Sequence, residues 1–179
     1  MADLKEALKF VLPHEGGYGE PPGDDQPTYA GIIAADLALY HKVPVSSITV
    51  QQIKDLAHHP DVVLDIYKQQ YWDLINGEHI HNQNIASAIM DTAVNRGVSV
   101  GAKYAQKTCN LLGSHLVIDG HIGPASILAI NTYAQASFIR HFEALEMAGY
   151  EALIAANPAR NTKYRHSWES RASDLLKLV

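Results

Sequence analysis

Residues 13–33 read Pro-His-Glu-Gly-Gly-Tyr-Gly-Glu-Pro-Pro-Gly-Asp-Asp-Gln-Pro-Thr-Tyr-Ala-Gly-Ile-Ile. Just before this stretch, apolar residues recur at helical spacing, namely Leu4, Ala7, Leu8, Val11 and Leu12. This pattern predicts a helix that buries one face, and Gly16 and Gly17 are expected to end it. The stretch therefore places one carboxylate, Glu15, at the C-terminal end of a buried helix.

Glu15 and the acidic loop after it have the residue types that general acid catalysis needs. A carboxyl group beside apolar surface and near the negative end of a helix dipole favours its protonated form. The loop from Gly19 to Pro27 carries Asp24 and Asp25 among turn-forming residues, where carboxylates stay solvated and ionised. One protonated and one ionised carboxyl group across a cleft is the arrangement used in glycoside hydrolysis. The alternative is that Glu15 makes a local cap or salt bridge and that the aspartates only form the turn.

Composition limits the classes of protein that this chain can be. Its 179 residues suit one domain, or two lobes that share a cleft. The single cysteine, Cys109, excludes an internal disulfide, and its apolar helical surroundings predict a core residue rather than a nucleophile. The net charge of −5 argues against a nucleic-acid partner. No signal-peptide pattern opens the chain and no long apolar run follows, so we expect cytoplasmic synthesis and no membrane insertion.

The rest of the chain has helical patterns separated by short breaks. Thr49 and Gln52 have the spacing of a capping box, Pro60 suits a first helical position, and Asn157-Pro158 breaks a helix. The expected helices cover residues 34–42, 49–58, 60–72, 84–96, 99–112, 124–133, 135–156 and 162–178. We expect Tyr71-Trp72 to pack in the core and the helix over 84–96 to be the hydrophobic hub between two lobes.

The opening motif resembles that of glycoside hydrolase family 108, which contains phage-type N-acetylmuramidases with a lysozyme-like fold. Glu-Gly-Gly-Tyr at 15–18, the acidic loop, and Thr-Tyr-Ala-Gly-Ile at 28–32 carry the resemblance. Three later motifs also look like family motifs: Met-Asp-x-x-Val-Asn-x-Gly at 90–97, Asp-Gly-His-Ile-Gly-Pro-Ala-Ser at 119–126, and Ser-Trp-Glu-Ser-Arg at 167–171. The second of these resembles the family's predicted peptidoglycan-binding segment, and in the third Ser167 replaces a glycine.

The acidic loop departs from the family pattern, which reads Asp-Pro-Gly-Gly-x-Thr at this point. The Pro-Gly-Gly is missing here and the loop is shorter. Counting forward from Glu15 places the family aspartate on Asp24, whereas counting back from Thr28 places it on Gly23. We favour Asp24, with Asp25 as the alternative, and the position of Thr28 stays open for the same reason.

The resemblance implies a mainly α, lysozyme-like fold of two lobes around a substrate cleft, with a small β-hairpin near residues 18–33. Residues 1–90 would form the N-terminal catalytic lobe. Residues 91–179 would form the C-terminal helical lobe that resembles the peptidoglycan-binding segment. The two lobes are expected to make one compact structural unit.

The resemblance also implies an endolysin-type, bacteriolytic lysozyme that cleaves the β-1,4 bond between N-acetylmuramic acid and N-acetylglucosamine. Glu15 would be the general acid. The other implied site residues are Asp24, Asp25 and Thr28 for catalysis, and Tyr18, Tyr29, Asp91 and Asn95 for substrate binding. Alternatively, the tyrosines pack the loop, and Asp91 and Asn95, which lie at i, i+4, hydrogen-bond each other. Trp168 and Arg171 lie one helical turn apart and could stack on each other, which favours a structural role.

The implied partner is the peptidoglycan glycan strand of the bacterial cell wall, without cofactor or nucleic acid. His79 and His81 could ligate a metal, but no third ligand stands at a telling spacing, so we expect no metal. We expect a monomer that reaches the wall through a separate holin or a secretion system. The rival functions are a non-catalytic peptidoglycan-binding module and a lytic transglycosylase or chitinase relative.

Overall fold

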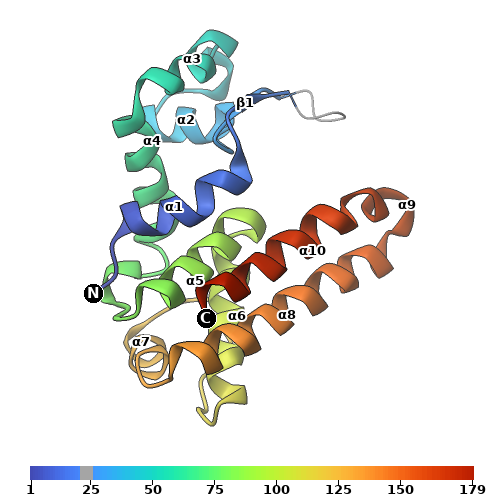
Figure 1. Cartoon of the computed structure of the whole chain (residues 1–179). Coiled ribbons are helices and arrows are strands. Elements are labelled where there is room, and N and C mark those ends of the chain that lie inside the picture. The colour runs from blue at the N-terminus through green and yellow to red at the C-terminus, as the bar shows by residue number, and fades with distance from the viewer. Residues whose placement is uncertain (21–25) are drawn as a thin grey trace.

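Helices form most of the computed structural model, which describes residues 1–20 and 26–179 (Figure 1). The α-helices are α1 Leu4–Glu15, α2 Ala34–His41, α3 Val50–Asp55, α4 Pro60–Tyr67, α5 Gln83–Arg96, α6 Val98–Leu111, α7 Pro124–Ile130, α8 Gln135–Ala156, α9 Pro158–Asn161 and α10 Arg165–Asp174. Short 3-10 turns lie at Val45–Ser47, Leu56–His58, Gly77–His79, Thr162–Tyr164 and Leu175–Leu178, and a π-helical turn lies at Lys68–Trp72. The mainly α prediction is confirmed.

Local sequence signals set several helix ends as expected. Thr49 and Gln52 form the predicted capping box at the start of α3. Pro60 occupies the first turn of α4. Gly16 ends α1 with φ of +73°, in the left-handed region that glycine adopts without strain. The bounds of α8 coincide with the predicted helix over residues 135–156.

Several predicted helices are divided in the structure, and the one over 49–58 is α3 followed by the 3-10 turn Leu56–His58. The expected helix over 60–72 is α4 followed by the π-helical turn Lys68–Trp72. This turn brings Trp72 into the core, where it is 3% exposed and lies against Gly77. The expected helix over 162–178 is divided into a 3-10 turn, α10 and a second 3-10 turn, because its first and last residues wind more tightly than an α-helix.

A short antiparallel hairpin follows α1, as predicted. Strand β1, Tyr18–Gly19, pairs with β2, Thr28–Tyr29, so that Tyr18 lies opposite Tyr29 and Gly19 opposite Thr28. Tyr29 and Ile32 form a further bridge that folds the chain back before α2. The hairpin therefore brings β2 and the turn after it next to the end of α1.

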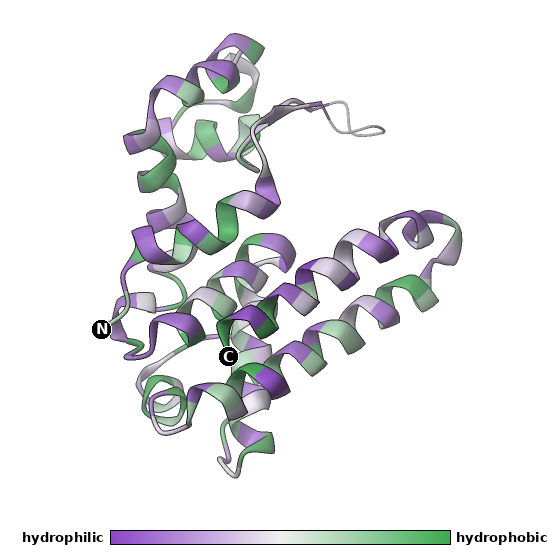
Figure 2. Cartoon of the chain, in the orientation of Figure 1, coloured by the Kyte–Doolittle hydropathy of each residue, from purple (hydrophilic) through white to green (hydrophobic). Residues whose placement is uncertain are grey.

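Helix α5 is the centre of the molecule. Nine consecutive residues from Ile85 to Ala93 are buried, and the helix packs against α1, α6, α8 and both the π-helical and C-terminal turns. In Figure 1, α2, α3 and α4 gather on one side of α1, whereas α8 and α10 run side by side on the other. Along α8, hydrophobic and hydrophilic residues alternate in Figure 2, as expected for a helix with one buried face.

One connected set of buried residues runs from Ala2 to Leu175. Cys109 belongs to it, is fully buried, and has a pKa raised by burial to about 12, so it packs as a small core residue. The expected boundary between residues 90 and 91 falls in the middle of α5. Within the described ranges, no helix is both long and apolar enough to span a membrane.

Candidate active site

Glu15 is the last residue of α1, and its side chain is 16% exposed. The turn after β2 passes directly over its carboxyl group. At Gly31, which has φ of +73°, an added Cβ would lie 2.7 Å from Oε2 of Glu15. Gly31 therefore lets the backbone approach the carboxyl group closely, in a conformation that other residues rarely adopt.

Arg171 of α10 reaches Glu15 from the other side. Its Nη1 lies 2.8 Å from Oε1 of Glu15, and the arginine is 8% exposed. Oε1 is buried and accepts no well-directed hydrogen bond from the described residues, so the contact is chiefly an ion pair. This corrects the expected environment of Glu15, because its carboxyl group lies against a guanidinium and not only beside apolar surface.

Asp91 of α5 holds Arg171 in place. Arg171 Nε donates to Asp91 Oδ2 at 2.9 Å, and Nη2 donates to Oδ1 at 2.9 Å. Asp91 is 2% exposed, so this two-bonded pair is almost wholly removed from water. Burial opposes the charge of Arg171, but the carboxylates of Asp91 and Glu15 outweigh burial and raise the pKa of the guanidinium.

His14 extends this cluster of charges. Its Nδ1 lies 3.2 Å from Oδ1 of Asp91, and its Nε2 lies 3.1 Å from Oδ2 of Asp174. The hydrogen bond with Asp91 is the main cause that raises the pKa of His14, with Asp174 adding to it against the effect of burial. Asp174 in turn has a lowered pKa, first because of Lys177 and then because of His14. The cluster thus ties α1, α5 and α10 together.

Two tyrosines contribute to the surroundings of Glu15. Tyr67 donates its hydroxyl to the carbonyl of Ala30 at 2.7 Å. Burial first, and then the negative charge of Glu15, raise the pKa of Tyr67. The pKa of Tyr71 is raised to about 12 by burial, by Asp36 and by Glu15. Both phenols therefore keep their protons at neutral pH.

The hairpin residues of the predicted site lie close to the chain around Glu15. Tyr29 is half-buried and, with Gly16 and Ala30, lines a cavity of about 620 Å³. Tyr18 is 39% exposed and donates to Oε1 of Glu20 at 2.7 Å. Thr28 Oγ1 is buried and finds no hydrogen-bond partner in residues 1–20 and 26–179. The two candidate loop carboxylates, Asp24 and Asp25, lie outside the described residues.

From their i, i+4 spacing we expected Asp91 and Asn95 to share one face of α5. In the structure their side chains have different partners. Asp91 turns inward to Arg171, whereas Asn95 Oδ1 accepts from the hydroxyl of Tyr150 at 2.7 Å. Asn95 is exposed and borders a cavity of about 300 Å³ beside Trp168. Of the two, only Asn95 is placed where it could touch a ligand directly.

Trp168 and Arg171 do not stack on each other, although their spacing along α10 would allow it. The ring of Trp168 stacks with Tyr150 at 5.2 Å and 14° and with Tyr164 at 5.4 Å and 27°. Arg171 points instead to the two carboxylates. The two residues lie one helical turn apart as predicted, but each side chain contacts other partners.

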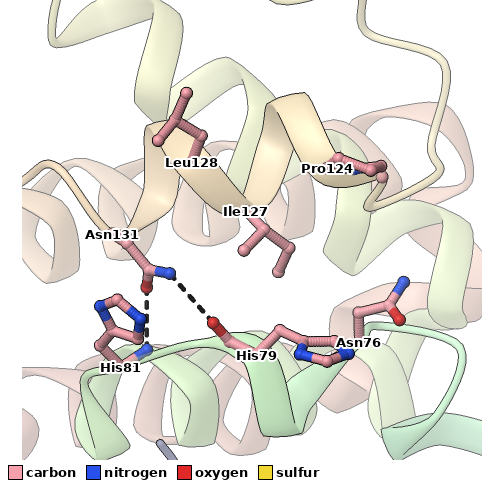
Figure 3. Close-up of a pocket in the computed structure, with 8 residues that line it drawn as sticks. Asn76, His79, His81, Pro124, Ile127, Leu128 and Asn131 are labelled. Carbon is pink, nitrogen blue, oxygen red and sulfur yellow. Dashed lines mark hydrogen bonds between the residues drawn. The ribbon is translucent and has the colours of Figure 1, made fainter.

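His79 and His81 lie in the wall of another cavity, of about 600 Å³, shown in Figure 3. Asn131, directly after α7, joins the two sides of this cavity, because its amide donates to the His79 carbonyl at 2.9 Å and its Oδ1 accepts from the His81 N–H at 2.8 Å. Gly123 and Pro124 from the predicted peptidoglycan-binding segment also line it. In the part of the chain that the structure describes, no three His, Cys, Asp or Glu side chains form a metal-holding group.

Comparison with known structures and families agrees with this architecture. A solved structure, "Structure of Brucella abortus SagA", matches with a TM-score of 0.77 at 23% identity, over 97% of this chain and 91% of that one. A search of curated proteins finds no match. The fold is lysozyme-like, and the protein is of the glycoside hydrolase class. The family model Glycosyl hydrolase 108 matches residues 8–97, which is 90 of the 179 residues, and the chain belongs to this family.

Proposed function

We propose that the protein is a peptidoglycan hydrolase of the N-acetylmuramidase type, which cleaves the β-1,4 bond between N-acetylmuramic acid and N-acetylglucosamine. The observation that carries the proposal is the placement of Glu15. It lies inside the matched family segment, at the end of α1, with its carboxyl group held between Gly31 and Arg171. A mostly buried carboxyl group fixed on the end of a rigid helix suits proton transfer at a defined point.

In this proposal Glu15 is the general acid. It protonates the glycosidic oxygen that leaves C4 of N-acetylglucosamine while positive charge develops on the N-acetylmuramic acid ring. Asp24 or Asp25, with Thr28, stabilises that charge or positions the attacking water. A carboxyl separation of about 5 Å would give retention of configuration, and one of about 6.5–9.5 Å would give inversion.

The proposed substrate is the glycan strand of the bacterial cell wall. Tyr18 and Tyr29 flank the acidic loop, and their rings would pack on sugar faces. Asn95, which is exposed, would offer an amide to the same strand. We propose that a holin or a secretion system brings the protein to the wall, where it acts as a monomeric, endolysin-type lysozyme.

Specific observations favour two other functions. The departure of the acidic loop from the family pattern favours a binding module that does not cleave. The placement of Glu15 beside Arg171, within the described residues and apart from the acidic loop, also fits a lytic transglycosylase, which needs only one acid.

Digestion of purified peptidoglycan with the native protein, followed by mass identification of the fragments, tests the proposal. We expect fragments that end in a reducing N-acetylmuramic acid. Anhydro ends would identify a transglycosylase, reducing N-acetylglucosamine ends a different bond, and intact peptidoglycan with bound protein a binding module. Each of these three results would reject the muramidase proposal.

The same digestion decides which loop carboxylate takes part. We expect Asp24→Asn to lower the rate by about 100-fold or more and Asp25→Asn to lower it much less, since ionised partners of the acid contribute on this scale. The reverse order would move the role to Asp25. Full activity in both variants would show that neither residue is the second catalytic group.

A further inference from the structure

Arg171 is placed where it can control Glu15 without itself contacting the substrate. Three of its side-chain nitrogens are used: Nε and Nη2 on Asp91 and Nη1 on Glu15. The two bonds to Asp91 fix the plane of the guanidinium, so the direction of Nη1 is fixed as well. The carboxyl group of Glu15 is therefore held by a group that is itself held from the central helix α5.

The other groups that face this pair do not replace the positive charge of Arg171. Tyr67 on α4 and Tyr71 on the π-helical turn face Glu15 as neutral phenols. Asp91 on α5 and His14 on α1 lie behind the arginine and partly offset each other. Asp24 and Asp25 lie outside the described residues.

We propose that Arg171, fixed by Asp91, is a positioning residue for Glu15 that orients its carboxyl group toward the bond to be cleaved. The proposal rests on the function proposed above, with Glu15 as the acid. A general acid must lie within hydrogen-bond reach of the oxygen that it protonates. A displacement of about 1 Å can cost about 100-fold in rate, so a group that fixes the carboxyl group affects kcat more than KM.

The test compares kcat and KM on peptidoglycan for the native protein and three variants. In Asp91→Asn/Arg171→Met, which leaves no unpaired carboxylate at position 91, we expect kcat per folded protein to fall about 10-fold or more with KM unchanged, because the acid is no longer oriented. Arg171→Lys keeps the charge but loses the fork, so it should also lose kcat without a change in KM.

Arg165→Met is the matched control. Arg165 lies on the same helix, is 41% exposed in its side chain, and pairs with Glu151 and Glu169 away from the site. This variant should keep both kcat and KM. A merely structural role of Arg171 would lower the amount of folded protein in the double variant but would leave kcat per folded molecule unchanged.

A second readout does not depend on activity. Binding to insoluble peptidoglycan should be equal for the native protein and the double variant, because Arg171 is proposed to act through Glu15 and not to contact the substrate. Arg171→Gln, whose amide can still bond Asp91, replaces the double variant if the latter is unfolded. An unchanged kcat in a folded variant would overturn the proposal, whereas an inactive native protein would overturn the proposed function instead.

Discussion

Arg171 and Arg96 both lie against buried carboxylates, but the two guanidinium groups have different hydrogen-bond partners. Arg171 makes two bonds of 2.9 Å to Asp91 and an ion pair of 2.8 Å to Glu15. Arg96 lies 3.7 Å from the carboxylate of Glu146, which is beyond hydrogen-bond distance. The first arginine thus joins carboxylates into one charged cluster, and the second does not.

Aromatic rings support Arg96 instead. Its Nη1 donates to the hydroxyl of Tyr104 at 2.9 Å, and its guanidinium lies 5.3 Å from the Tyr104 ring and 5.0 Å from the Tyr150 ring. Burial raises the pKa of Glu146, with the charge of Arg96 opposing that effect. Asp91 of α5 therefore holds the arginine that contacts the candidate acid, whereas Arg96 of the same helix packs among aromatic rings. Only the cluster around Arg171 contains the candidate acid Glu15.

Removing one carboxylate from each cluster should give the largest contrast. Asp91→Asn takes a two-bonded partner from buried Arg171 and should lower the free energy of unfolding by about 3 kcal/mol. Glu146→Gln removes a poorly bonded acid and should lower it by less than about 1 kcal/mol. Urea unfolding at neutral pH measures both. Equal losses would show that the two arginines are bound alike.

A methyl group at Gly31 should separate stability from activity. Gly31→Ala puts a Cβ into the left-handed region, which costs about 1–2 kcal/mol, and also pushes against Oε2 of Glu15. Gly113→Ala is the matched control, because Gly113 has φ of +111° and open space around it. Both variants should lose similar stability in urea, and only Gly31→Ala should lose hydrolysis of peptidoglycan. Normal activity in Gly31→Ala would mean that the position of Glu15 is not critical.

The smallest expected effect is the pH dependence that comes from His14. Since the pKa of His14 is raised above about 6.5, its protonated form stabilises the fold below that pH, and this contribution is lost as pH rises through the folded-state pKa. The native protein should therefore exceed His14→Gln by about 1 kcal/mol or less near pH 6, and the difference should shrink by about pH 8. Urea unfolding across this range measures it. His141→Gln, on an exposed face of α8, should show no such trend, and a trend in both variants would remove His14 as its source.

Much of the fold could be predicted because its signals are local. The apolar repeat before Glu15, the glycine after it and the capping box at Thr49 all act within a few residues, and the structure contains each of them. The position of Glu15 at a helix end could be predicted for the same reason. The π-helical turn at Lys68–Trp72, where Trp72 packs against Gly77, could not be predicted from helical spacing alone.

The partners of the candidate acid could not be predicted from spacing. Arg171 meets Glu15 and Asp91 only after α10 has packed across α1 and α5. The one available signal was Arg171 itself, a charged residue in the family's closing motif, and its spacing from Trp168 suggested a stack between them. In the structure Trp168 stacks on tyrosines and Arg171 pairs with carboxylates. The environment of Glu15 therefore differs from the expected one.

The most direct test of the central claim, that Glu15 donates the proton, is the rate of peptidoglycan cleavage by Glu15→Gln. Glu6→Gln is the matched control, because Glu6 lies on the same helix, is exposed, and pairs only with Lys9 among the described residues. We expect Glu15→Gln to lose about 100-fold or more of the native rate while it stays folded, and Glu6→Gln to keep the native rate. Cleavage by Glu15→Gln at the native rate would contradict the account.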